Sequence, residues 1–282
     1  SYTATEKRHI AKEHLIRKQL AKNWIYKKRF TITDKAVDKI ISGYTAEAGV
    51  RSLERRIGEC MRKVVLMMAQ DASMEKVRVT EKNLTEFLGP VKRTKEKKNR
   101  KDAVGIVRGL AVTSVGGDTL SIEINTMPGK GNIELTGQLG DVMKESARTA
   151  ISYVRSVAEE YEVPDDYFEK HDMHLHIPEG AVPKDGPSAG IALGVAVLSA
   201  VTGKKVRADL AMTGEVTLRG RVLPIGGVKE KLLAAKMAEI TLVLVPKKNE
   251  GDVKELEKEI TDGIRIVFVE TMEEVIREAI LM

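Results

Sequence analysis

The chain has 282 residues, of which 42% are hydrophobic, and a formal net charge of +6. This length predicts two folded domains, and the 4% aromatic content predicts aliphatic cores. The single cysteine, Cys60, excludes an internal disulfide framework and is typical of a reducing cytosol, so we expect a cytoplasmic protein. The apolar run 191–201 is too short to span a bilayer and no signal peptide is evident, so no membrane association is expected.

Residues 1–90 are predicted to form a small α-helical domain. Apolar positions among basic residues indicate a first helix over 3–23, and a Thr-Asp capping signal at 33–34 starts a second. A third helix is expected from Glu47 to about Ala69. A short strand at 76–79 and a further helix from Thr80 complete this part of the chain.

Residues 91–102 are predicted to be a basic linker, because they are polar and almost free of apolar side chains. A solvated hinge is the interpretation we favour, and a phosphate-binding stripe is the alternative. Nucleic-acid binding would need a docking surface with aromatic residues or a recognised module, and neither is visible in the sequence.

Residues 103–282 mix strand and helix patterns, which favours an α+β domain with helices packed on a compact sheet. Strands are expected at 103–115, 120–125, 173–177, 239–245 and 264–269, and helices at 141–159, 191–201 and 228–236. The run Gly129–Asn132 is expected to be a hairpin-type connection rather than a phosphate loop. The pattern G-x-x-x-x-G-K-[ST] does not occur, so this chain should not hydrolyse ATP alone.

One serine, Ser188, lies in the sequence Gly186-Pro187-Ser188-Ala189-Gly190, just before the apolar helix predicted at 191–201. Backbone N–H groups at a helix start can stabilise a developing negative charge, as acyl transfer requires. The sequence also fits the G-x-S-x-G nucleophile elbow, but no histidine follows Ser188, which excludes the triad order of that family. The alternative is a serine that only caps a helix.

A lysine is the next candidate for the base, since a desolvated lysine can be neutral near pH 7. On a helical projection of the predicted helix at 228–236, Lys231 falls among small apolar residues, whereas Lys229 and Lys236 fall on another side. The alternative is a lysine whose stem packs on alanines while its amine reaches water.

Two histidines, His174 and His176, share one face of the strand predicted at 173–177. A metal site is not favoured because no third ligand is evident. An esterase that uses one of these histidines as its base remains an alternative. Glu123 lies in an alternating strand and could equally be a surface residue.

Three motifs together resemble the proteolytic domain of Lon, the ATP-dependent protease, across roughly residues 103–282. They are Pro183-Lys184-Asp185-Gly186-Pro187-Ser188-Ala189-Gly190, Met212-Thr213-Gly214-Glu215-Val216-Thr217-Leu218-Arg219-Gly220 and Leu223-Pro224-Ile225-Gly226-Gly227-Val228-Lys229-Glu230-Lys231. The resemblance implies a Ser–Lys dyad that hydrolyses peptide bonds, with nucleophile Ser188 and base Lys231. It further implies that Thr213 orients the lysine amine and that Asp185 belongs to a loop that can pair with Lys231 when the site is closed. The other supporting residues that it implies are Glu123, Ala189 and His174.

The run Ala48-Gly49-Val50-Arg51-Ser52-Leu53-Glu54-Arg55 resembles the sensor-2 motif of the small helical subdomain of the Lon ATPase. The resemblance implies that Arg51 contacts nucleotide phosphates, with ATP and Mg²⁺ as cofactors of an intact enzyme whose ATPase core is missing here. It also implies a homo-hexameric ring, unfolded or damaged protein substrates and weak DNA binding. The alternative is a scaffold or nucleic-acid-binding module in which Ser188 is not catalytic.

Overall fold

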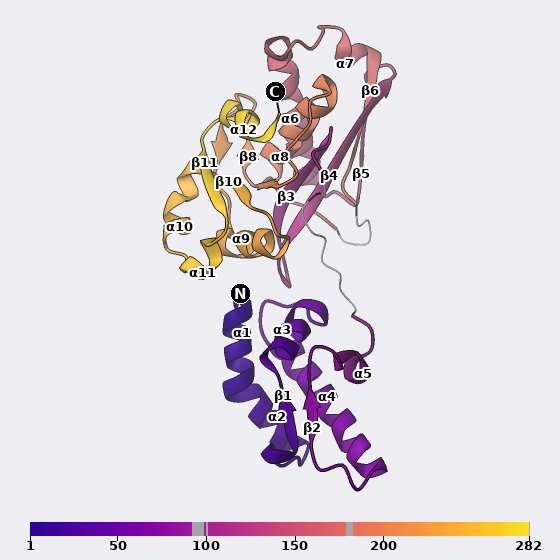
Figure 1. Ribbon diagram of the computed structural model, residues 1–282. Coiled ribbons are helices and arrows are strands. Elements are labelled where there is room, and N and C mark those ends of the chain that lie inside the picture. Colours follow the sequence, from indigo (N-terminus) through magenta and orange to yellow (C-terminus); the bar gives the residue numbers. More distant parts are fainter. Residues whose placement is uncertain (92–98, 100, 179–182, 282) are drawn as a thin grey trace. The chain divides into compact units, whose positions relative to one another are not determined.

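The computed structural model describes residues 1–91, 99, 101–178 and 183–281. The chain forms two compact units, a smaller N-terminal unit and a larger C-terminal unit (Figure 1). Most of the predicted linker 91–102 lies outside the described residues. The domain boundaries and the role of the linker therefore stay predictions.

The N-terminal unit is mainly helical, as predicted. Its helices are α1 (Ala4–Ile10), which continues through a π-helical turn (Ala11–Leu15) into α2 (Ile16–Lys22), then α3 (Asp34–Gly43), α4 (Arg51–Gln70) and α5 (Leu84–Leu88). Thr33 caps α3 by accepting a hydrogen bond from the amide of Ala36, as its capping signal predicted. Strands β1 (Phe30–Ile32) and β2 (Val77–Val79) pair in parallel, and β1 was not predicted.

Two helix starts differ from the predicted positions, and side-chain hydrogen bonds explain both. Helix α4 begins at Arg51 because the carboxylate of Glu47 accepts the amides of Ser52 and Leu53, at 2.7 and 2.8 Å, and so caps the helix from outside. Helix α5 begins only at Leu84. The amide of Thr80 donates to Asn83 Oδ1 at 2.7 Å, which holds the preceding residues in a turn.

The C-terminal unit is built on a seven-stranded sheet in the order β11-β10-β7-β3-β4-β6-β5. Its strands are β3 (Ile106–Thr113), β4 (Gly116–Pro128), β5 (Ile133–Thr136), β6 (His171–His176), β7 (Leu210–Met212), β10 (Leu242–Pro246) and β11 (Arg265–Val269), and β8 (Glu215–Val216) pairs separately with β9 (Val222–Leu223). Its helices are α6 (Asp141–Val157), α7 (Tyr167–Lys170), α8 (Gly190–Thr202), α9 (Val228–Met237), α10 (Glu250–Lys254), α11 (Lys258–Thr261) and α12 (Met272–Ala279). The mixture of helix and sheet confirms the α+β prediction.

Helices cover both faces of this sheet. Along β10, Leu242 and Leu244 join a hydrophobic cluster with residues of α6, α8 and α12, whereas Val243 and Val245 join a second cluster with residues of α9, α10 and α11. This alternation follows from the two-residue period of a strand. Strand β10, which lies at the end of the run predicted as a strand at 239–245, is buried on both sides for this reason.

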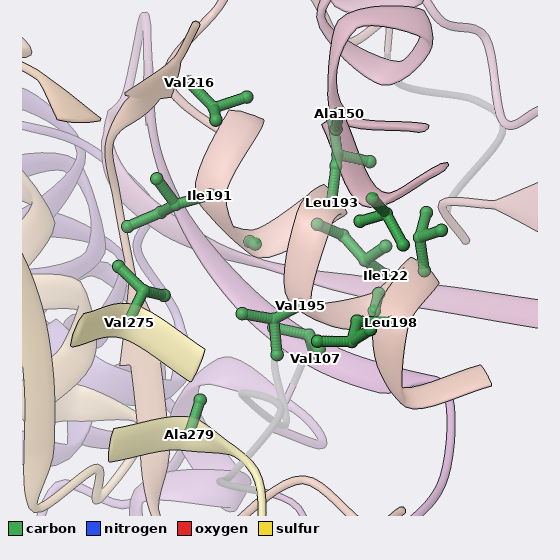
Figure 2. Close-up of a cluster of buried hydrophobic side chains, with 14 of the residues drawn as sticks. Val107, Ile122, Ala150, Ile191, Leu193, Val195, Leu198, Val216, Val275 and Ala279 are labelled. Carbon is green, nitrogen blue, oxygen red and sulfur yellow. The ribbon is translucent and has the colours of Figure 1, made fainter. Parts of the chain in front are cut away.

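Helix α8 lies at the centre of the larger cluster (Figure 2). Its residues Ile191, Leu193, Val195 and Leu198 lie among side chains from the sheet, α6 and α12, labelled in Figure 2 as Val107, Ile122, Ala150, Val275 and Ala279. At its first residue, Gly190, an added Cβ would lie 2.7 Å from the amide nitrogen of Val216. Glycine therefore lets the start of α8 approach the β8 backbone closely.

The predicted hairpin at Gly129–Asn132 is wrong, because β6 lies between β4 and β5 in the sheet. Strand β6 pairs antiparallel with β4 and parallel with β5. The amides of Lys130 and Asn132 instead donate to Asp172 Oδ1, each at 2.8 Å. The loop thus encloses a carboxylate of the chain itself, which explains its glycines without a bound phosphate.

Within the described residues, the structure contains no helix with the length and apolar character needed to cross a membrane.

We predict that Leu193→Ala lowers the free energy of unfolding by about 2–5 kcal/mol, because it removes a fully buried side chain from the centre of the core. Urea unfolding followed by circular dichroism measures the change. Leu218→Ala is the matched control, since Leu218 is 62% exposed, and it should change stability by no more than about 0.5 kcal/mol. Equal losses in the two variants would contradict the packing described here.

Candidate active site

Ser188 lies in the turn before α8 and is half-buried. Its carbonyl oxygen accepts a hydrogen bond from the amide of Gly214 at 2.8 Å, and the amide of Ile191 donates to the carbonyl oxygen of Gly214 at 3.0 Å. The segment that follows β7 is therefore paired by its backbone with the serine turn. Two of the sequence motifs, 25 residues apart at Ser188 and Thr213, meet here.

Lys231 lies on α9 and is only 3% exposed. Burial lowers its pKa from 10.5 to about 8, because the charged ammonium loses its hydration. Lys236, on the other side of the same helix, is exposed. The helical projection therefore picked out the buried lysine correctly, and the interpretation in which the Lys231 amine reaches water is wrong.

Thr213 connects the lysine with the serine turn. Lys231 Nζ donates to Thr213 Oγ1 at 3.0 Å, and Thr213 Oγ1 donates to the carbonyl oxygen of Ser188 at 3.3 Å. A threonine hydroxyl carries one proton, so a hydroxyl that donates to Ser188 can only accept from Lys231. This fixes one N–H of the amine on Thr213, and the nitrogen lone pair of a neutral Lys231 must point in another direction.

The side chain of Asp185 lies beside the N-terminus of α6. Its Oδ1 accepts the amide of Met143, the third residue of that helix, at 2.9 Å, and the amide of Gly186 at the same distance. It thereby caps a helix whose own N-cap residue, Gly140, has no side chain to do so. In this arrangement the carboxylate binds α6, and burial alone is the cause of the lowered pKa of Lys231.

The remaining candidates lie on the neighbouring strands β4 and β6: Glu123 on β4, and His174 and His176 on β6. Glu123, which is exposed, stands opposite His176 in the pairing of β4 with β6. The hydroxyl of Thr136 on β5 lies 2.8 Å from His174 Nε2 and 2.7 Å from His176 Nδ1. Thr136 thus joins the two imidazoles, and the described residues contain no cluster of three or more metal-ligating side chains.

Two further residues hold segments that lead into the site, and they were not predicted. Ser146 on α6 directs its hydroxyl to the carbonyl oxygen of Pro187 at 3.5 Å. Asn249 is 3% exposed, and its side-chain amide forms two 2.9 Å hydrogen bonds with the backbone of Ile225, in the loop that leads into α9. Neither residue belongs to a motif, so no local signal could have found it.

Arg51, in the N-terminal unit, is the first residue of α4 and is exposed. The next two amides of the helix are occupied by the Glu47 carboxylate. The Glu47 carbonyl oxygen in turn accepts a hydrogen bond from Nζ of the buried Lys7. The guanidinium of Arg51 is thus presented to solvent from a well-anchored helix start.

We predict that Lys231→Met raises the melting temperature most at pH 7 and progressively less as the pH rises from 8 to 10.5. The folded-state pKa of Lys231, about 8, lies below its ordinary value of 10.5. Between these values the unfolded state binds more protons, so the wild type gains stability with increasing pH. Below pH 8 the cost of burying the charge is fully present.

Melting curves of wild type and Lys231→Met between pH 7 and 10.5 test this. Lys248→Met, at an exposed position, is the control and should differ from wild type by an amount that does not depend on pH. A Lys231→Met difference that is also independent of pH would contradict the proposed burial of the charge.

Comparison with known proteins identifies the family. Residues 78–282 match the model of the Lon protease (S16) C-terminal proteolytic domain, and residues 21–77 match that of the Lon protease AAA+ ATPase lid domain. The chain is 52% identical to the Lon protease of Lachnoclostridium phytofermentans, with all of this chain and 39% of the relative covered. It is 48% identical to Lon protease 1 of Bacillus subtilis, with 99% of this chain and 36% of the relative covered.

The chain is also 47% identical to Lon protease 2 of Thermus thermophilus, with all of this chain and 35% of the relative covered. It therefore spans little more than a third of the length of these relatives. Residues 78–88, which match the proteolytic model, pack in the core of the N-terminal unit through Val79, Leu84 and Leu88. The two family models together cover residues 21–282, and the chain belongs to the Lon protease family.

Proposed function

We propose that the C-terminal unit is a serine endopeptidase that uses Ser188 as nucleophile and Lys231 as general base. The observation that carries this proposal is the buried amine of Lys231, linked through Thr213 to the backbone of Ser188. A pKa of about 8 in place of 10.5 raises the neutral fraction of the lysine at pH 7 about 300-fold. Family membership supports the same reaction class.

In the proposed mechanism, neutral Lys231 accepts the proton of the Ser188 hydroxyl, and the serine oxygen attacks the substrate carbonyl carbon. Lys231 then gives this proton to the leaving amine, and the peptide bond breaks. Water, deprotonated by Lys231, then attacks the acyl carbon, the bond from this carbon to Ser188 Oγ breaks, and Lys231 returns the proton to Oγ. Thr213 keeps one N–H of the amine engaged throughout, so that the lone pair stays available for the serine.

Backbone amides at the start of α8 would stabilise the oxyanion. The amides of Gly190 and Ile191 already donate to the carbonyl oxygens of Pro187 and Gly214, at 3.1 and 3.0 Å. We therefore assign this role to the amides of Ser188 and Ala189. Removal of one such donor typically costs about 2.7–4 kcal/mol in transition-state stabilisation.

Three residues support the catalytic pair in this proposal without taking part in the chemical steps: Asp185, Glu123 and His174. Asp185 holds the loop before Ser188 on α6, as its hydrogen bond to Met143 indicates. Glu123 and His174 lie on the face of the sheet that also carries His176. Because both imidazoles contact Thr136, we favour Lys231 over either histidine as the base.

The intact enzyme, in this proposal, is a cytoplasmic ATP-dependent protease that degrades unfolded or damaged proteins as a homo-hexameric ring. Arg51, exposed at the start of α4, would supply one contact to the phosphates of ATP, which would bind together with Mg²⁺. An ATPase core would supply the phosphate loop, whose pattern does not occur in this sequence. Weak DNA binding remains a secondary proposal, and a scaffold or nucleic-acid-binding module with a non-catalytic Ser188 is the rival function.

We predict that Ser188→Ala and Lys231→Ala each lower the rate of peptide cleavage by about 10²-fold or more while remaining folded. Cleavage of a fluorogenic peptide and of an unfolded protein measures the loss. Lys229→Ala, two residues away on the same helix, and His176→Gln are the controls and should retain activity. If Lys231→Ala kept substantial activity and His176→Gln lost it, the base would be a histidine and not Lys231. If the wild type neither cleaved the substrates nor reacted with a peptidyl boronate, the rival function would be favoured.

We also predict that kcat/KM for a peptide substrate rises with pH and levels off above about pH 8. The neutral form of Lys231 is the active one, and burial places its pKa near that value. Initial rates between pH 6 and 9.5 give the profile. A midpoint near 6.5 would instead indicate a histidine base.

A further inference from the structure

Lys184 lies four residues before Ser188, and the residue is only 7% exposed. Its Nζ donates a hydrogen bond to the carbonyl oxygen of Gly137 at 3.0 Å. A buried ammonium is costly unless acceptors compensate for its lost hydration. The mechanism above gives this amine no chemical step, so its place in the fold calls for a different explanation.

The backbone of Lys184 forms hydrogen bonds with the same segment that accepts its side chain. Its amide donates to the carbonyl oxygen of Gln138 at 3.0 Å, and its carbonyl oxygen accepts the amide of Gly140 at 2.7 Å. These bonds form a parallel bridge with Leu139. Lys184 therefore holds the segment 137–140, which joins β5 to α6, through both its backbone and its side chain.

The Gly137 carbonyl oxygen, one acceptor of the ammonium, is held in a fixed position. Gly137 has a φ of +112°, and a Cβ added there would lie 2.0 Å from the carbonyl oxygen of Ile177. Only glycine fits this close approach. The carbonyl oxygen that receives Lys184 Nζ is thus set by the edge of the sheet and not by a flexible loop.

We define residues 183–187 as the serine loop. Hydrogen bonds of residues that follow Lys184 also hold this loop. Asp185 accepts the amide of Met143 at 2.9 Å, and the hydroxyl of Ser146 lies 3.5 Å from the Pro187 carbonyl oxygen. The loop therefore follows the segment before α6 and the first turns of that helix. Its course determines the direction in which Ser188 and the neighbouring amides face the substrate.

We propose that Lys184 is a positioning residue for the nucleophile, whose ammonium clamps the serine loop onto the segment 137–140. The inference rests on the proposed function, because it assigns Lys184 to the geometry around Ser188. Lys184 itself touches no reacting atom. Its contribution is to hold the loop in the one place from which the Ser188 hydroxyl and the Ala189 amide act together.

Three variants of the 282-residue chain test the clamp. Lys184→Met keeps the apolar stem and removes the donor, Lys184→Arg keeps a charged donor, and Lys248→Met changes an exposed lysine as the control. For a fluorogenic peptide we expect Lys184→Met to lower kcat on the order of 10- to 100-fold, with KM changed less than about threefold. Lys184→Arg should recover a large part of this loss, and the midpoint of the pH profile should not move, because Lys231 is untouched.

Hydrogen–deuterium exchange gives a readout that does not depend on activity. In folded Lys184→Met, peptides covering 137–144 and 183–190 should exchange faster than in wild type, and those of α12 should not. Unchanged exchange, whether or not kcat falls, would overturn the proposal, as would an equal loss in Lys248→Met. If Lys184→Met does not fold, Lys184→Gln, which keeps a shorter neutral donor, is measured in the same two ways.

Failure of the proposed function would look different. Wild type that neither cleaves the peptide nor reacts with a peptidyl boronate would remove the Ser–Lys assignment, while the exchange data would still decide whether Lys184 holds the loop.

Discussion

The removal of one lysine amine from water is the interaction on which the rest of the site depends. Lys231 is buried and donates to Thr213, and the burial lowers its pKa to about 8. The fold bears the cost of this burial because α9 and the central strands form a packed apolar layer around it. A site built on a solvated lysine would need a separate base, since such a lysine is protonated at neutral pH.

The sequence predicted those features that have a local signature. The glycines around Ser188 and the apolar run after it indicated a helix start with a serine, and helical periodicity separated Lys231 from Lys229 and Lys236. Thr33 revealed the start of α3 in the same way. In each case the information lies within one helical turn or one strand of the residue concerned, and the structure agrees with it.

Features that depend on distant segments could not be predicted. Nothing near Asp185 indicates that it caps α6, because its partner Met143 lies 42 residues away. The insertion of β6 between β4 and β5 depends on the pairing of three separate strands, and local turn signals favoured a simple hairpin. Hydrogen bonds across the fold decided these two cases. The start of α4 was misplaced for a local reason, since Glu47 accepts the amides of Ser52 and Leu53 and acts as an external cap and not as part of the helix.

The burial of Lys231 also has a consequence for the protein during its own synthesis. A chain that has not yet folded carries an ordinary lysine at this position, protonated at neutral pH, and it therefore lacks a general base. On the proposed mechanism the base appears only when α9 packs on the sheet, by which time the chain's own peptide bonds are largely sequestered in secondary structure. On this mechanism unfolded copies cannot cleave one another, because the folding that makes the enzyme reactive also makes it a poor substrate.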